Sequence, residues 1–168
     1  AKTQFNALDI PYKYNLNYAP HLGMFKAHAG DNPIDQLHFM AEQGFKSFED
    51  NDMRKRPIKL QEKMSQTMQK LNIKMGVFVA HEIAWRRPNL ASGKKDERDA
   101  FLSEIKSSVE VAKRVNAKWM TVVPGLKDFE KNIEYQTINV IETLKRACDI
   151  LEPHGLVMVL EPLSFSNH

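Results

Sequence analysis

The sequence has few of the features that mark several classes of protein. It contains one cysteine, Cys148, which excludes a disulfide within the chain and leaves the redox environment undetermined. Cys148 occupies an apolar helical position, where we expect a structural thiol rather than a nucleophile. No stretch approaches the roughly 18 consecutive apolar residues of a membrane-spanning helix, so we expect a soluble protein with no membrane partner.

The sequence also has no large excess of basic over acidic residues. The 168 residues include 24 Lys and Arg against 21 Asp and Glu, a net charge of +3. The basic residues form short runs, at 53–56 and 93–95, rather than one long stripe. A surface that follows a phosphate backbone needs clustered positive charge, so we expect no nucleic-acid partner.

Phosphate-binding loops and a targeting segment are absent as well. No G-x-G-x-x-G follows an apolar run and no G-x-x-x-x-G-K occurs, which disfavours the common nucleotide-binding folds. The sequence begins at Ala1 without Met and without the apolar core of a signal peptide. The compartment is therefore unknown. The cytoplasm is the default, and export with a leader removed before Ala1 is the alternative.

What the sequence does contain is a repeated order of elements. The apolar content of 42% and charged content of 27% are those of a folded domain. Four times, an amphipathic helical pattern ends at Gly or Asn, residues that adopt the left-handed conformation at helix ends. A short apolar run follows each time. The junctions are Gly44, Asn72, Asn116 and Gly155, and the predicted strands are Phe45–Glu49, Ile73–Ala80, Ala117–Val123 and Leu156–Leu160.

Helices and strands are therefore expected to alternate along the chain. Apolar residues spaced by three and four predict four helices, the first two beginning near Pro33 and Pro57. A first strand is predicted at Tyr14–Ala19, and the nearly continuous apolar runs of later strands suggest burial on both faces. Strict alternation indicates an α/β fold with a parallel sheet. We expect residues 1–13 to be an N-terminal extension and residues 14–168 to form one domain.

The missing phosphate loops favour a closed (β/α)8 TIM barrel over an open sheet. A complete barrel needs about 250 residues and eight strands. The predicted elements supply the first five strands and four helices, so we expect an incomplete barrel.

Active sites of such barrels lie at the carboxyl ends of the strands. Asn17, Glu49 and His81 stand there and are candidates for binding substrate. Each also has an ordinary structural interpretation, as a turn former, a loop cap and a surface loop residue respectively. The polar residues at these strand ends are Asn17, His21, Glu49, Asp50, Asn51, His81, Glu82 and Glu161.

Glu161 is the strongest candidate for a catalytic residue. It directly follows a five-residue apolar run and precedes Pro162. We expect its carboxylate to be largely removed from water, and a buried carboxylate must be neutralised, hydrogen-bonded or bound to a cation. A salt bridge across the barrel mouth is the structural alternative.

Three segments of the sequence resemble the xylose isomerase-like TIM barrels, and within them the hydroxypyruvate isomerase-like branch of sugar isomerases and epimerases. One is 14–18 with 23–25, and another is the G-F-x-x-x-E pattern at 44–49. The most specific is the L-x-P-H-G … E-P pattern, at 151–155 and 160–163. The resemblance covers only the N-terminal part of the family's domain.

This resemblance implies a divalent metal, Mg²⁺ or Mn²⁺ with Zn²⁺ as a further option, at the barrel mouth. Glu161 matches a metal ligand that, in this branch, also transfers protons as an acid or base. The other ligands and a second glutamate would come from the sixth to eighth strands, past His168. We therefore expect the 168 residues alone to be inactive and to bind metal weakly, since such hard cations need several oxygen ligands.

The expected activity is that of an isomerase or epimerase acting on a small carbohydrate or hydroxy-ketoacid through an enediolate. A zinc-dependent nuclease like the apurinic endonucleases of the same superfamily is one alternative. A non-catalytic ligand-binding relic is another, and a homo-oligomer stays open. The exact substrate, the metal and any continuation past His168 are undetermined.

Overall fold

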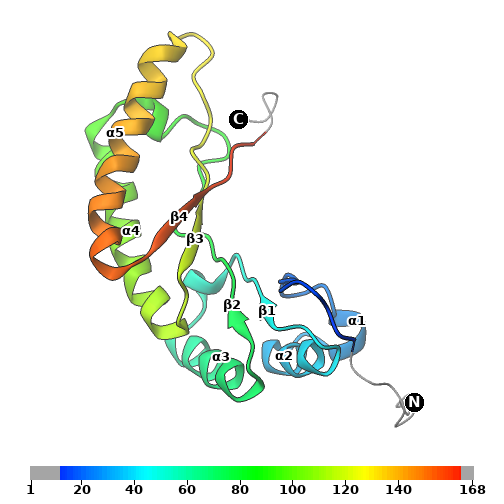
Figure 1. Ribbon diagram of the computed structural model, residues 1–168. Coiled ribbons are helices and arrows are strands. Elements are labelled where there is room, and N and C mark those ends of the chain that lie inside the picture. The colour runs from blue at the N-terminus through cyan, green and yellow to red at the C-terminus, as the bar shows by residue number, and fades with distance from the viewer. Residues whose placement is uncertain (1–11, 164–168) are drawn as a thin grey trace.

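The computed structural model describes residues 12–163, in which helices and parallel strands alternate (Figure 1). Most of the predicted N-terminal extension, residues 1–11, lies outside the described residues. So does the segment 164–168.

The four predicted helices are present, and a short helix that the sequence did not predict precedes them. The order is α1 (Lys26–Ala29), α2 (Pro33–Glu42), α3 (Ile58–Leu71), α4 (Lys95–Val115) and α5 (Ile133–Leu151). The side chain of Asn32 caps α2 by accepting from the Ile34 amide at 3.0 Å. Asn72 and Asn116 end α3 and α4 in the left-handed conformation, with φ of 54° and 52°. These stops confirm two of the predicted junctions.

Four short strands follow the helical junctions and pair in parallel. β1 (Ser47–Phe48) pairs with β2 (Lys74–Met75), and β3 (Trp119–Val122) pairs with β4 (Val157–Leu160). An isolated bridge between Val79 and Thr121 joins the two pairs. The resulting order of segments is the order of the chain, as in a (β/α) barrel.

The parallel array curves, and the helices cover its outer side. Figure 1 shows α2 to α5 along the convex edge of an arc and the strands along its inner edge. The core between the two layers contains fully buried side chains from both, among them Phe48, Phe78, Met64, Ile105 and Met120. The molecule is thus a segment of a barrel wall with its helical cover, consistent with the incomplete barrel expected from the sequence.

The predicted first strand at Tyr14–Ala19 is wrong. This segment is irregular, and its backbone turns tightly where the Tyr18 amide donates to the Leu16 carbonyl at 3.1 Å. Asn15 precedes that turn and Asn17 is its central residue, and asparagine favours a turn over a strand. Parallel pairing begins only at His21, which bridges to Glu49.

The expectation that the last strand is covered on both faces is also wrong for the described chain. β4 lies at the edge of the array, paired with β3 on one side, and Val157, Val159 and Leu160 are 40–48% exposed. Among residues 12–163, no helix has the length and apolar character needed to cross a membrane.

Candidate functional site

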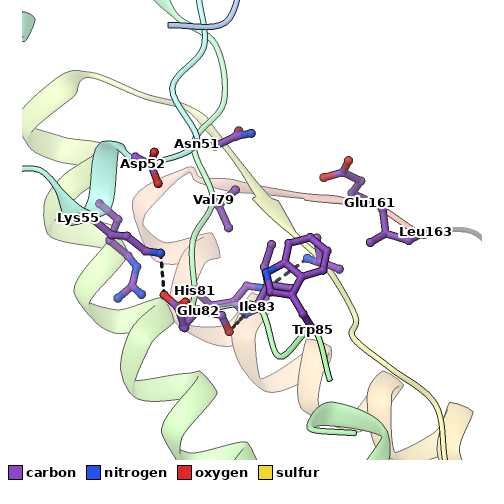
Figure 2. A pocket seen from close by; sticks show the side chains of 12 residues that line it. Asn51, Asp52, Lys55, Val79, His81, Glu82, Ile83, Trp85, Glu161 and Leu163 are labelled. Atoms are coloured by element: carbon purple, nitrogen blue, oxygen red, sulfur yellow. Dashed lines mark hydrogen bonds and ion pairs between the residues drawn. The ribbon is translucent and has the colours of Figure 1, made fainter. Parts of the chain in front are cut away.

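A hollow of about 290 Å³ lies on the inner side of the arc at the carboxyl ends of the strands. Figure 2 shows that its wall comes from separate strand-end loops. Asn51 and Asp52 follow β1, Glu161 follows β4, and the loop after β2 contributes His81, Glu82, Ile83 and Trp85. Val79, Val123 and Leu163 add apolar surface. Polar groups from loops far apart in sequence therefore converge on one space, as in a barrel active site.

His81 is buried in the wall, with 2% of its surface exposed. Its Nδ1 donates to the Glu82 carbonyl at 3.0 Å, and its Nε2 accepts from the Val123 amide at 3.2 Å. This arrangement requires the neutral ring, and burial lowers the pKa of His81 below its ordinary value. Because both ring nitrogens are engaged within the chain, His81 holds the ends of two adjacent strand segments in place. Direct contact between His81 and substrate stays a prediction.

A buried ion pair shapes the loop after β1. The carboxylate of Asp50, 1% exposed, accepts from Arg56 Nε at 2.5 Å and from its terminal nitrogen at 3.0 Å. Bonding to this carboxylate raises the pKa of Arg56. Gln61 on α3 binds the Met53 and Arg56 carbonyls from beneath. This loop is thereby fixed, with Met53 in the core and with Asn51, Asp52, Arg54 and Lys55 lining the hollow.

Two further ion pairs cross the wall of the hollow. Lys55 Nζ lies 2.9 Å from Glu82, as the dashed line in Figure 2 shows, and Arg54 lies 3.7 Å from Glu104 on α4. Glu104 also accepts from the Glu82 amide at 2.6 Å. Both cations of the wall are thus already matched with carboxylates.

Glu161 reaches the hollow from the end of β4. Its backbone amide donates to the Val122 carbonyl at 3.0 Å, which continues the β3–β4 pairing up to the candidate residue. Its side chain is exposed, so the expected removal from water is not found in the described chain. The physical reason is the open edge of β4, which leaves the carboxylate covered from one side only.

The hollow brings together two of the four candidates from the sequence, His81 and Glu161. Asn17 is exposed in the irregular N-terminal segment, and neither it nor Glu49 lines the hollow. Glu49 is half-buried, and its backbone pairs with Pro20 and Leu22. The proposed substrate contacts of these two residues stay predictions.

Sequence reasoning missed Lys55 and Trp85, which both line the hollow. Lys55 belongs to a basic run in the sequence, and Trp85 stands five residues past the predicted strand end at Ala80. The signal that could have found both is their place in loops that follow strands, where barrel side chains face the site.

The described residues do not by themselves make a metal site. Within 12–163, no group of three or more His, Cys, Asp and Glu side chains could hold an ion. Glu161 supplies one carboxylate, whereas a hard cation such as Mg²⁺ takes about six oxygen ligands, some of them from water.

A model of the xylose isomerase-like TIM barrel family matches residues 37–168. The chain belongs to this family. Membership in the xylose isomerase-like TIM barrels agrees with the alternating order, the parallel array and the strand-end hollow. No curated protein matches the sequence.

Solved structures place the xylose isomerase-like chain among barrels of several activities. It resembles an AP endonuclease of family 2 from Brucella melitensis, with 18% identity over 89% of this chain and 56% of that one, and a TM-score of 0.68. It also resembles a D-psicose 3-epimerase from Clostridium cellulolyticum H10, with 12% identity, coverage of 91% and 54%, and a TM-score of 0.72. It resembles a 3-keto-D-glucoside 4-epimerase from E. coli too, with 16% identity over 89% of this chain and 57% of that one, and a TM-score of 0.67.

These identities show a shared fold. The chain spans about half the length of the solved structures that it matches.

Proposed function

We propose that this chain is part of an isomerase or epimerase that acts on a small carbohydrate or hydroxy-ketoacid, of the hydroxypyruvate isomerase-like type. The observation that carries the proposal is the position of Glu161, a carboxylate at the carboxyl end of β4 facing the strand-end hollow. Epimerases among the structurally similar proteins support this choice of reaction class.

Proton transfer by Glu161 is the central step of the proposal. Its carboxylate takes the proton from the carbon next to a substrate carbonyl, and the C–H electron pair becomes the C=C bond of an enediolate. The isomer forms when a proton returns to the former carbonyl carbon and the neighbouring hydroxyl passes its proton to the former carbonyl oxygen. The epimer forms when a proton returns to the original carbon from the opposite face, which needs a second acid from outside residues 12–163.

A substrate can reach the carboxylate of Glu161, because this side chain is exposed and lines the hollow. A general base must lie within hydrogen-bond reach of the proton that it removes. The polar wall around it, from Asn51 to the Lys55–Glu82 pair, offers hydrogen bonds to substrate hydroxyls.

A divalent cation remains part of the proposal, with Mg²⁺, Mn²⁺ or Zn²⁺ as the options. Glu161 is the ligand that the family resemblance implies, and Asp52 and Glu82 are the other carboxylates at the hollow. No group within residues 12–163 could hold the ion by itself, so further ligands would have to come from elsewhere, and only the first proton abstraction is assigned to Glu161.

Hydrogen exchange tests the proposal directly. The native protein that contains this chain is incubated with hydroxypyruvate or D-fructose in D₂O, with Mn²⁺ supplied, and loss of the substrate C–H signal is followed by proton NMR. We expect exchange and product formation, with Glu161→Gln reducing both at least 100-fold. Glu62→Gln, an exposed position on α3, is the matched control and should leave both rates unchanged.

Two outcomes contradict the proposal. Retained exchange in Glu161→Gln removes the role of Glu161. Cleavage of abasic DNA by the zinc-loaded protein, with no turnover of sugars, selects the nuclease instead. A zinc nuclease with several histidine ligands has less support, because among residues 12–163 only His81 lines the hollow and both its ring nitrogens are bonded within the chain.

A further inference from the structure

Trp85 presents a large aromatic surface to the hollow. It follows β2 in the loop after His81, and 57% of its surface is exposed although it lines the hollow. Its backbone is held by a bond from its amide to the Ile83 carbonyl at 3.1 Å. Figure 2 shows its indole on the same wall as Glu161 and Leu163. A tryptophan placed so offers a flat apolar face beside the candidate catalytic carboxylate.

The Lys55–Glu82 pair supplies the complementary polar surface. Its ammonium carries donors and its carboxylate accepts, and both groups are more than half exposed, at 56% and 59%. Hydroxyl groups can both donate and accept, so they match such a pair without breaking it. The hollow therefore combines an aromatic face with a rim that suits hydroxyl groups. A sugar offers a matching surface to each, C–H groups to the aromatic face and hydroxyl groups to the rim.

The charges of the hollow disfavour an anionic ligand. Its two cations, Lys55 and Arg54, are each matched with a carboxylate. Asp52 and Glu161 are further acidic groups of the same wall. A phosphorylated or carboxylated substrate would have to displace one of the two ion pairs to reach a cationic side chain of the described residues.

We propose that Trp85 is a substrate-binding residue that stacks on an uncharged carbohydrate whose hydroxyls meet the Lys55–Glu82 pair. This inference rests on the proposed function and narrows it from carbohydrates and hydroxy-ketoacids to neutral sugars. Pairs of aromatic rings contribute about 0.5–1.5 kcal/mol, and a similar contribution from a sugar stacked on the indole would change Kd by about two- to tenfold.

Fluorine NMR separates this site from the rest of the protein. The native protein is labelled with 5-fluorotryptophan, and the Trp85→Phe and Trp119→Phe variants identify the two resonances by their disappearance. Trp119 is the matched control, because it is 43% exposed but lies in β3 beside a different hollow, at the amino ends of the strands. D-Fructose and D-fructose 6-phosphate are the two probes.

We expect D-fructose to shift the Trp85 resonance, to leave that of Trp119 unchanged, and to bind about two- to tenfold more weakly to Trp85→Ala than to Trp119→Ala. The phosphate ester should bind more weakly than the neutral sugar. Tighter binding of the ester overturns the neutral class, and a Trp85 resonance that responds to neither probe overturns the subsite.

The Glu161→Gln variant keeps the two proposals apart. Sugar binding at Trp85 with turnover lost in this variant supports both. Binding at Trp85 without any turnover by the unsubstituted protein contradicts the proposed function and leaves the sugar subsite standing. Turnover without a Trp85 response contradicts the subsite alone.

Discussion

Replacing Asp50 by alanine should destabilise the protein more than any surface charge substitution. Asp50 is 1% exposed and receives two hydrogen bonds from Arg56, whose side chain is 22% exposed. Removing one partner of a buried ion pair costs about 3–5 kcal/mol, because the other charge stays buried without a partner. Arg56 retains some contact with water, so we expect a loss of about 2–4 kcal/mol. That is a large part of the roughly 5–15 kcal/mol by which domains are stable.

The loss can be measured by urea denaturation followed by circular dichroism. Asp31→Ala is the matched control, because Asp31 also pairs with a cation, Lys26, but the two side chains are 88% and 60% exposed. An exposed pair contributes little, so this variant should leave the denaturation midpoint unchanged. Adding Arg56→Met to Asp50→Ala should recover part of the loss by removing the unpaired charge.

Equal midpoints for Asp50→Ala and Asp31→Ala would refute the reasoning. So would a double variant less stable than Asp50→Ala, since the cost would then not come from an unpaired guanidinium.

Three further predictions concern other parts of the fold. Burial lowers the pKa of His81 below its ordinary value of 6.5, so the unfolded chain binds a proton at His81 more readily than the folded chain does. The free energy of unfolding should therefore fall as the pH drops below about 6.5, and it should fall less steeply in His81→Gln. Asn116→Ala should cost about 1 kcal/mol in thermal or urea unfolding because its φ is 52°, whereas Asn116→Gly should lie within about 0.5 kcal/mol of the unsubstituted protein. Met64→Ala, at a fully buried core position, should cost about 2–5 kcal/mol, and Ile58→Ala on the exposed side of the same helix should cost far less.

The helices and their ends were predictable because their signals are local. Asn72 and Asn116 stop helices through their own backbone conformation, and Pro33 begins one by its fixed φ. Apolar spacing on each helix likewise needs only one face to be buried. These signals do not depend on where distant parts of the chain lie.

The features that sequence reasoning missed depend on long-range placement. The segment near Tyr14 has residues that suit a strand. The ring of Tyr14 instead stacks on Phe45, with 4.8 Å between the ring centroids, and the backbone turns before parallel pairing begins. The surroundings of Glu161 are set by what lies beside β4, which its own neighbours in sequence do not reveal. The approach of Lys55 to Glu82 joins loops 27 residues apart, and no local pattern marks it.

The candidate site was therefore predictable as a location and only partly as a set of residues. The strand-end rule found His81 and Glu161. The hydrogen bonds that engage both nitrogens of His81 could not be inferred, because one of them comes from Val123 on the following strand segment.

The order of the strands has a consequence for biosynthesis. Each strand pairs with the one made just before it, β2 with β1 and β4 with β3, and the Val79–Thr121 bridge joins the two pairs in the same sequence. A ribosome makes the chain from its amino terminus at about 5–20 residues each second, so each new strand is made after a strand segment with which it pairs. The arc can thus grow from its amino-terminal end during translation by the addition of one strand at a time.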